Sequence, residues 1–496
     1  MTNMPDNIKS AAIIVGAGIA GIAASIRLQH KGYSVIVMEA NSYPGGKLTQ
    51  FTQGQYRFDA GPSLFTMPQY VDDLFRLTGR DPNDYFQYRR KDESCRYFWN
   101  DGTRLTAHAE PKKFAQETEK TLGVKAEIVL KKLEKSHLMY ELAGRTFLEK
   151  PLNRWATWLN KDVGKAMLKL HKLSLFSTMH QDNRNILKHP KLVQLFDRYA
   201  TYNGSDPYRA PGVLNIIPHL EHGVGTYHPV KGMHQITESL VSLAEDLGVK
   251  FHLNEKVEEI LVEKNVATGV KTSNGVYKAA LVVSNMDITP TYRHLLKHQK
   301  APERTLKQEG SSSALIFYWG IKKSFPELGL HNIFFSEDYQ TEFKEIFDGK
   351  VPASDPTVYV NISSKDVESD APQGCENWFV MVNVPQHNNQ NWDELIPLYR
   401  KTIINKLSPL LKINIEETIE NESVLTPLEI EQKTSSKGGS LYGTSSNSRY
   451  AAFLRHTNDS NNIRGLYFCG GSVHPGGGIP LCLLSAKIVS EICPKP

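Results

Sequence analysis

The sequence is poor in cysteine, and its few cysteines are not arranged for metal binding or for a disulfide framework. They are scattered along the 496-residue chain and show none of the paired spacings of structural zinc sites. Their odd number favours a reducing compartment. We therefore expect no metal site and a cytoplasmic location. The cysteines are Cys95, Cys375, Cys469, Cys482 and Cys493.

Long hydrophobic runs and a marked excess of one charge are also missing. No window approaches about 18 uninterrupted apolar residues, so no segment is expected to cross a bilayer, and the start of the chain lacks the pattern of a secretory signal. The net charge of +5 is mild and argues against a nucleic-acid partner held by a broad basic surface. The composition, 40% hydrophobic and 22% charged, is that of a globular protein with two or three structural regions.

Residues 11–39 contain a complete strand–turn–helix–strand pattern. The apolar run 11–15 predicts a buried strand, residues 19–30 carry helix-forming residues, and the apolar run 35–38 predicts a second strand. The turn between the first strand and the helix has the sequence G-x-G-x-x-G. In this context the glycine triplet predicts a dinucleotide-binding site rather than a purely structural turn.

Three glycines and one acidic residue carry this prediction. The glycines allow a tight turn, close approach of the backbone to a pyrophosphate, and close packing of helix on strand, while the helix start offers unpaired N–H groups to the phosphates. Glu39, after the second strand, can accept hydrogen bonds from a ribose diol, and its charge would repel a 2′-phosphate. The candidate binding residues are Gly16, Ala17, Gly18, Ile19, Ala20, Gly21, Glu39 and Ala40.

Two further glycine motifs follow this unit. A Pro-Gly-Gly-Lys turn and a later Asp-Ala-Gly-Pro-Ser turn resemble the extended nucleotide-binding motif of the flavoprotein superfamily that includes amine oxidases and carotenoid desaturases. The resemblance implies FAD, with the paired glycines along the diphosphate and the Gly-Pro turn near the flavin. Lys47 stands in the position of an arginine and offers a point charge without a planar fork. The candidates here are Gly45, Gly46, Lys47, Leu48, Gly61, Pro62 and Ser63.

A second strong motif spans residues 465–480 near the end of the chain. A short apolar strand runs into a glycine-rich turn, and a helix is expected from about Leu481 to Lys487. Backbone N–H groups at such a helix start can stabilise the negative charge of a reduced flavin. Glycines also let the backbone lie close to a flat ring, where side chains would clash. The candidates are Gly470, Gly471, Gly478, Ile479 and Pro480.

This motif resembles the C-terminal signature of bacterial carotenoid desaturases of the phytoene desaturase type. The likeness also includes residues 198–208 and the N-terminal unit, and so covers most of the chain. Residues 438–443 and the tail Gly-Gly-Gly-Ile-Pro-Leu look most like the hydroxycarotenoid 3,4-desaturase branch. The same resemblance implies that the backbone at Val257 reads the adenine, and that Asn285 and Met286 belong to a turn at the cofactor.

The predicted fold is α/β, a Rossmann-like FAD-binding domain of the amine oxidase/phytoene desaturase superfamily with an inserted α+β substrate domain. The FAD-binding domain is expected in three pieces, with a helical substrate or membrane region and a substrate domain of sheet and helices between them. The pieces are 1–105, 231–290 and 426–496, the helical region is 106–230, and the substrate domain is 291–425.

Residues 155–177 have the pattern of a helix that lies on a membrane surface. Four lysines share one face, apolar residues occupy the opposite face, and Trp155 and Trp158 flank its start. Peripheral contact with a membrane is one interpretation. The other is a surface helix whose apolar face packs on the protein's own core.

Desaturation removes a hydride from one carbon and a proton from its neighbour, and a flavin accepts the hydride. The protein then needs a long apolar tunnel and few polar catalytic groups, which agrees with the lack of a Ser-His-Asp pattern. No catalytic residue is identified, and Asp206 and His228 are bare candidates for the proton acceptor. His474 either titrates near the ring or fixes a turn, and Cys469 is expected to be a small buried residue. The candidate tunnel residues, each with packing in the hydrophobic core as the alternative, are Phe65, Tyr199, Tyr202, Tyr208 and Phe317.

The leading hypothesis is therefore an FAD-dependent carotenoid desaturase that introduces the 3,4 double bond of a 1-hydroxycarotenoid. A phytoene desaturase-type enzyme, a carotenoid isomerase and a terminal oxidase are alternatives within the family. An amine oxidase and a non-catalytic lipid-binding flavoprotein are alternatives of other classes. The oligomeric state stays open.

Overall fold

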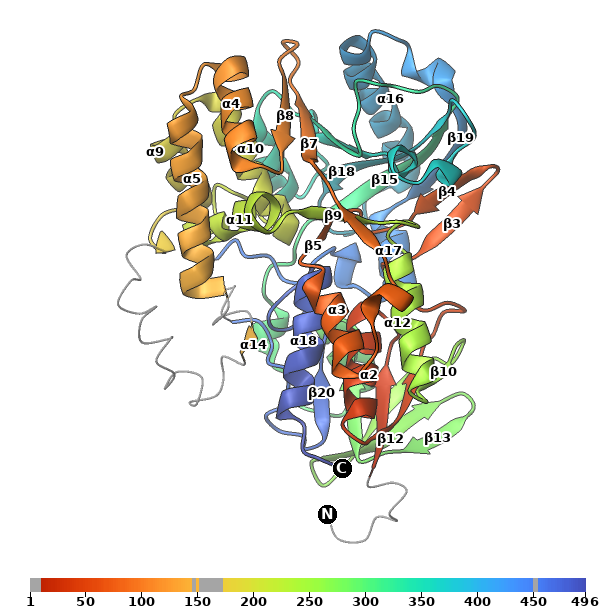
Figure 1. The fold of residues 1–496 in the computed structure, drawn as a ribbon. Helices are drawn as coiled ribbons and strands as arrows, with labels where there is room; N and C mark the ends of the chain where they lie inside the picture. Colours follow the sequence, from red (N-terminus) through yellow and green to blue (C-terminus); the bar gives the residue numbers. More distant parts are fainter. Residues whose placement is uncertain (1–9, 145–148, 151–172, 449–453) are drawn as a thin grey trace.

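The computed structural model describes residues 10–144, 149–150, 173–448 and 454–496. Two regions are stacked along the long axis of the molecule in Figure 1. The lower region holds both chain termini, a parallel sheet and the helices α2, α12 and α18. The upper region holds a larger sheet with helices on either side, and the chain passes between the regions several times.

A five-stranded parallel sheet forms the centre of the lower region. Its strand order is β10-β2-β1-β14-β20, so strands from the beginning, middle and end of the chain pair side by side. Parallel strands are covered on both faces, which explains why they are apolar along their length. This sheet confirms the predicted Rossmann-like fold. Its strands are β1 (Ala11–Val15), β2 (Ser34–Met38), β10 (Lys250–His252), β14 (Leu281–Ser284) and β20 (Leu466–Phe468).

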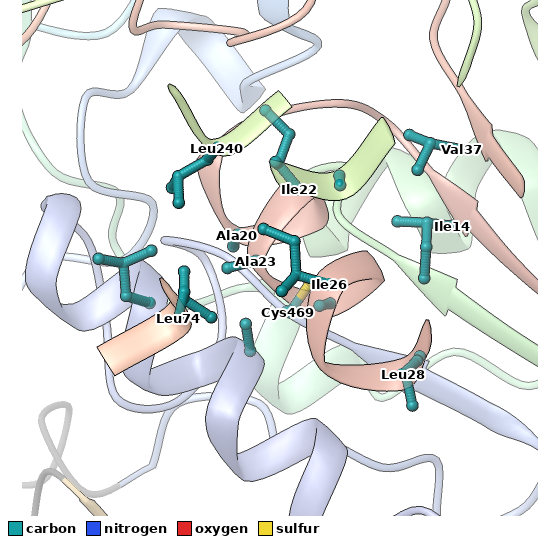
Figure 2. Close-up of a cluster of buried hydrophobic side chains, with 14 of the residues drawn as sticks. Ile14, Ala20, Ile22, Ala23, Ile26, Leu28, Val37, Leu74, Leu240 and Cys469 are labelled. Atoms are coloured by element: carbon teal, nitrogen blue, oxygen red, sulfur yellow. The ribbon is translucent and has the colours of Figure 1, made fainter. Parts of the chain in front are cut away.

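Helices α2 (Ile19–His30), α12 (Gln235–Asp246) and α18 (Ile479–Ile492) cover this sheet together with α3 (Gln69–Leu77). Figure 2 shows their shared core, in which the apolar side chains of α2 meet Leu74 of α3 and Leu240 of α12. Small alanines on α2 let the neighbouring helix approach closely. Cys469 is 1% exposed in this cluster and is the small buried residue that the sequence predicts.

The larger sheet has seven strands in the order β19-β15-β18-β17-β16-β7-β8. Helix α16 (Trp392–Leu411) packs on one face, where it meets Phe317 and Trp319 of β15. The opposite face of the same strand carries Ile316 and Tyr318 and packs toward β4. The strands are β7 (Glu93–Phe98), β8 (Arg104–His108), β15 (Ser313–Ile321), β16 (His331–Phe334), β17 (Val358–Asn361), β18 (Glu376–Val384) and β19 (Ile419–Leu425).

Strands β7 and β8 lie in this larger sheet, although the predicted first piece of the nucleotide-binding domain extends to residue 105. Strand β7 pairs in parallel with β16, so that Tyr97 lies opposite Ile333. The pairing favours a boundary before Glu93, and the remaining domain boundaries stay a prediction. The first hundred residues thus contribute strands to both large sheets. Which sheet a strand joins depends on partners that lie far away in the sequence.

Four helices build the flank of the upper region beside β7 and β8. They are α4 (Pro111–Leu122), α5 (Ala126–Met139), α9 (Met179–Leu187) and α10 (Pro190–Asp197). The predicted interfacial helix at 155–177 falls mainly on residues 151–172, outside the described part of the chain. Among the described residues, every helix is too short or too polar to reach across a bilayer.

The remaining elements are short. Three small sheets are formed by β3 (Gln50–Gln53) with β4 (Tyr56–Asp59), by β5 (Phe65–Thr66), β9 (Thr226–Pro229) and β6 (Tyr88–Arg90), and by β11 (Val257–Glu263), β12 (Val266–Thr272) and β13 (Gly275–Lys278). The short helices are α11 (Ile217–His219), α13 (Ile288–Pro290), α14 (Glu303–Leu306), α15 (Tyr339–Lys344) and α17 (Pro427–Thr434).

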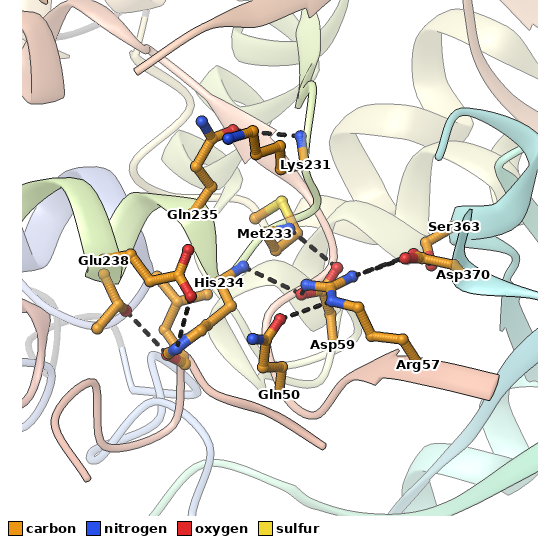
Figure 3. Close-up of polar contacts among 12 residues, drawn as sticks. Gln50, Arg57, Asp59, Lys231, Met233, His234, Gln235, Glu238, Ser363 and Asp370 are labelled. Atoms are coloured by element: carbon orange, nitrogen blue, oxygen red, sulfur yellow. Dashed lines mark hydrogen bonds and ion pairs between the residues drawn. The ribbon is translucent and has the colours of Figure 1, made fainter. Parts of the chain in front are cut away.

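An ion-pair network joins the two regions (Figure 3). The guanidinium of Arg57 on β4 lies 2.8 Å from the Asp59 carboxylate and 3.0 Å from that of Asp370 in the upper region. Asp59 also accepts the backbone N–H groups of Met233 and His234, just before α12 begins. The side chain of Asp370 is fully buried, so its charge depends on Arg57 for compensation.

Candidate functional site

The first glycine turn is closed so tightly that larger residues do not fit. Gly16 has φ +95° and donates its N–H to the carbonyl of Met38 at 2.7 Å. A Cβ atom on Gly18 would lie 2.6 Å from Asn285 Oδ1, and one on Gly21 would lie 2.2 Å from the carbonyl oxygen of Gly16. The turn therefore leaves its backbone bare, as close approach to a pyrophosphate requires.

Glu39 is held rigidly at the end of β2. Its Oε2 accepts the N–H of Ala17 at 2.7 Å, and its Oε1 accepts both the N–H and the side-chain amide of Asn41 at 2.9 Å. A carboxylate has about four acceptor positions, so capacity remains for a ribose hydroxyl. The geometry suits the role that the sequence predicts for this residue.

One cavity of about 1760 Å³ runs from this turn into the upper region. The N-terminal and C-terminal glycine clusters both line it, although they are more than 400 residues apart in the sequence. All of the predicted cofactor-binding residues line the cavity except Ala17 and Gly21. Ala17 acts through Glu39, and Gly21 packs α2 against the turn.

The C-terminal motif forms the opposite wall by close backbone packing. A Cβ on Gly470 would lie 2.7 Å from Asn285 Nδ2, and one on Gly477 would lie 2.8 Å from the Cα of Tyr442. Helix α18 begins at Ile479, two residues earlier than predicted, so the helix N-terminus itself reaches the cavity. Its N–H groups favour an electron-rich ligand edge there. The bare glycines, this helix start and Glu39 together fit a dinucleotide with a flat ring.

Lys47 lies on the cavity wall, but its ammonium is engaged by the protein. Its Nζ donates to the carbonyl oxygens of Ser440 at 2.7 Å and Leu441 at 3.1 Å. Burial lowers the pKa of Lys47 to about 8. The side chain thus ties the Pro-Gly-Gly-Lys turn to the 438–443 loop, and its contact with a diphosphate stays a prediction.

The upper half of the cavity lies against the seven-stranded sheet and is closed by residues 60–64, 198–202 and 441–443. Of the predicted tunnel residues, only Tyr202 lines it. The prediction was wrong for Phe65, Tyr199, Tyr208 and Phe317, which pack into hydrophobic clusters instead. Aromatic side chains that the sequence analysis missed supply the wall in their place: Tyr318, Tyr339, Tyr359, Phe379 and Tyr442.

The two candidate proton acceptors do not reach this cavity. Asp206 accepts the N–H of Tyr208 at 2.8 Å and stabilises a turn, where burial raises its pKa to about 6. His228 is buried near Asp366, at 3.7 Å. His474 donates to the carbonyl of Lys150 at 2.9 Å, which favours the turn-fixing role over titration at the ring. None of these three histidine and aspartate side chains lines the cavity.

Several polar side chains also line the upper half of the cavity, and two groups of them form hydrogen bonds. Arg198 donates to Tyr97 Oη at 2.8 Å and lies 3.4 Å from Glu221, with its guanidinium over the ring of Tyr199 at 4.6 Å. Elsewhere, Ser63, Tyr359 and His331 form a hydrogen-bonded line. The sequence analysis expected few polar groups here because a flavin that accepts the hydride leaves the protein little polar chemistry to do. Which strand faces meet the cavity could not be read from the sequence.

Comparison with known proteins agrees with this geometry. A family model for flavin containing amine oxidoreductases matches residues 19–493, nearly the whole chain. The chain belongs to this family and is a flavin-dependent oxidoreductase.

Relatives within the family are more specific. The 1-hydroxycarotenoid 3,4-desaturase of Flavobacterium sp. (strain P99-3) is 52% identical over 98% of this chain and 99% of its own. A 4,4'-diaponeurosporene oxygenase of Staphylococcus aureus (strain bovine RF122 / ET3-1) is 30% identical over 97% of both chains. The crystal structure of an oxidoreductase from Methanosarcina mazei superposes with a TM-score of 0.63 at 14% identity, covering 97% of this chain and 100% of that one, and shows the shared fold alone.

Proposed function

We propose that the protein is an FAD-dependent carotenoid desaturase that introduces the 3,4 double bond of a 1-hydroxycarotenoid. The observation that carries this proposal is the 52% identity to a 1-hydroxycarotenoid 3,4-desaturase along essentially the full length of both chains. The cofactor is proposed to be FAD because Glu39 suits a ribose and both glycine clusters meet at one cavity.

The size and lining of the cavity support two ligands. Ligand pockets usually measure about 300–1,000 Å³, and the cavity of about 1760 Å³ exceeds that range. Its lower half has the backbone surfaces of a nucleotide site, and its upper half has aliphatic and aromatic walls such as Ile316, Ile333 and Phe379. The proposed second ligand is the hydrophobic carotenoid.

A bound flavin would supply the hydride acceptor, since no protein side chain accepts a hydride. The residues of the chain then have three tasks. The glycine turns and Glu39 hold the cofactor in one position, the apolar upper wall holds an unreactive hydrocarbon against it, and both exclude water. Holding two reactants in register accounts for much of the acceleration that such a reaction needs.

Peripheral contact with a membrane is part of the proposal, because a carotenoid is stored in bilayers. The Lys-rich, Trp-flanked pattern of residues 155–177 supports it, and Phe176, at the end of that pattern, is 82% exposed. Co-flotation with anionic liposomes tests this contact. Protein that stays at the bottom of the gradient with such liposomes contradicts it.

The function is tested with purified holoprotein and carotenoids in liposomes. The 1-hydroxylated carotenoid is expected to give a product with one more conjugated double bond, detected by its longer absorption wavelength and its mass. An oxygenated product instead would favour the activity named for the relative from Staphylococcus aureus. No product from any carotenoid, together with peroxide release from amines, would favour an amine oxidase.

A further inference from the structure

Three polar side chains from distant parts of the chain meet on the wall of the cavity. Ser63 follows the Gly-Pro turn, Tyr359 lies on β17 and His331 begins β16. Ser63 Oγ is 2.7 Å from Tyr359 Oη, which is 2.8 Å from His331 Nδ1. The rings of Tyr359 and His331 are stacked with an interplanar angle of 18°, so the line is rigid.

This line keeps unused hydrogen-bonding capacity. The Nε2 atom of His331 has no partner among the described residues, but it is buried behind the cavity surface, so the capacity open to a ligand lies on the two hydroxyls. Ser63 and Tyr359 are only half-buried although they lie inside the molecule, because both face the cavity. A hydroxyl group offers one donor and two acceptor positions, so the single hydrogen bond of Ser63 leaves room for another.

A pure hydrocarbon gives these groups nothing to bind. Buried polar groups are normally paired, and an unpaired one is costly. Large apolar side chains lie next to the line, with Ile333 on the same strand as His331 and Phe379 packed beside Tyr359. The contrast indicates a ligand that is apolar along most of its length and polar at one point.

The proposed substrate has that form. Its C1 hydroxyl is two carbon–carbon bonds from C3, so whatever binds the hydroxyl must also lie beside the bond that is desaturated. Ser63 belongs to the turn that is predicted to approach the flavin. We propose that Ser63 and Tyr359, with Tyr359 held in place by His331, bind the C1 hydroxyl of the carotenoid and so place its C3–C4 bond for reaction. This inference rests on the proposed function.

The charge state of the line agrees with an uncharged partner. Burial lowers the pKa of His331 to about 3 and raises the pKa of Tyr359 above its ordinary value. Both side chains are therefore neutral near pH 7. An alcohol, which donates and accepts, can bond to the hydroxyls of Ser63 and Tyr359, which face the cavity.

The test compares two substrates across matched variants. The substrates are the 1-hydroxycarotenoid and the same polyene with hydrogen in place of the hydroxyl, both in liposomes. Tyr359→Phe removes the central hydroxyl and keeps the ring. Tyr318→Phe is the control, because Tyr318 also lines the cavity but donates its hydroxyl to the Ala60 carbonyl at 2.8 Å.

Wild-type protein is expected to prefer the hydroxylated substrate, as measured by kcat/KM. Tyr359→Phe should lower kcat/KM for that substrate by about 10- to 100-fold and change it by less than about threefold for the other. Tyr318→Phe should change both substrates by the same factor. Binding of the hydroxylated product, followed by quenching of tryptophan fluorescence, should weaken in Tyr359→Phe and not in the control.

Equal losses on both substrates in Tyr359→Phe would overturn the inference, because a merely structural role predicts them. If that variant fails to retain flavin, Ser63→Ala gives the same comparison with the same expected loss of preference. Wild-type protein that desaturates both substrates equally well would overturn the inference and leave the proposed function standing. Wild-type protein that desaturates neither would overturn the proposed function.

Discussion

The two halves of the cavity are built in different ways. In the lower half the backbone makes the site, since Gly18 and Gly21 leave no space for side chains and α18 presents its N-terminus. In the upper half, side chains from separate strands make the wall, among them Tyr318 and Tyr359. A backbone site is determined by a few consecutive residues, whereas a side-chain wall depends on which faces of distant strands meet.

The largest effect is expected in the backbone half. Gly21→Ala places a Cβ atom 2.2 Å from the carbonyl oxygen of Gly16, where only backbone movement can relieve the clash. We expect flavin-free or unfolded protein, measured by the ratio of flavin to protein absorbance after purification. The control is Gly79→Ala, which has no atom within 4 Å and costs only the strain of its positive φ, about 1 kcal/mol. Full flavin content in Gly21→Ala would show that the turn is not closed as described.

The next largest effect is expected at the ion pairs between the two regions, where a substitution should lower the stability of the protein. Arg57→Leu leaves the buried carboxylate of Asp370 without a counter-charge and should lower the free energy of unfolding by about 3–5 kcal/mol. Lys278→Met, which removes an exposed ion pair with Glu263, should cost at most about 1 kcal/mol. Chemical denaturation measures both. Similar losses in the two variants would contradict the role of Arg57 in joining the regions.

In the upper sheet, substitutions in the core should mainly lower stability, whereas substitutions on the cavity wall should mainly weaken ligand binding. Phe317→Ala opens a void in the fully buried cluster under α16 and should cost about 3–5 kcal/mol of stability. Met381→Ala, on the cavity wall, should cost less stability but weaken carotenoid binding. Thermal unfolding and fluorescence titration provide the two measurements. A Phe317→Ala variant that loses carotenoid binding at full stability would reverse this assignment.

The smallest effect is expected from pH. Burial lowers the pKa of Lys47 to about 8, and a neighbouring diphosphate would favour its charged form. Above pH 8 the side chain of Lys47 is mostly neutral and must take up a proton when the flavin cofactor binds. The affinity for the cofactor should therefore be constant below pH 8 and fall as the pH rises further. Lys47→Arg stays charged and should flatten this profile. Flavin release across pH 7–10 is the measurement, and an unchanged profile in Lys47→Arg would separate Lys47 from the diphosphate.

The sequence predicted the lower half well because its signals are local. The helix expected at 19–30 is α2 (Ile19–His30), and the predicted strands at 11–15 and 35–38 are β1 and most of β2. Apolar runs bounded by glycine define such elements with little help from the rest of the chain. Only the start of α18 was displaced, since Ile479 and Pro480 already lie in the helix.

The wall of the upper half could not be predicted from short sequence patterns. Strand β15 is apolar on both faces, so its sequence could not tell that Tyr318 faces the cavity and Phe317 faces the core. Strand β7 lies within the predicted first piece of the nucleotide-binding domain, and its pairing with β16 could not be read from the sequence because β16 lies more than 200 residues further along the chain. The line of Ser63, Tyr359 and His331 leaves no motif for the same reason.

A single anaerobic turnover tests the central claim most directly, namely that one flavin and one carotenoid share the cavity. Holoprotein is mixed with an excess of the 1-hydroxycarotenoid in liposomes without oxygen, and the carotenoids are then extracted and separated by chromatography. The account predicts one equivalent of the 3,4-desaturated product for each bound flavin. Absence of that product, or an oxygenated product that forms only when air is admitted, would contradict it.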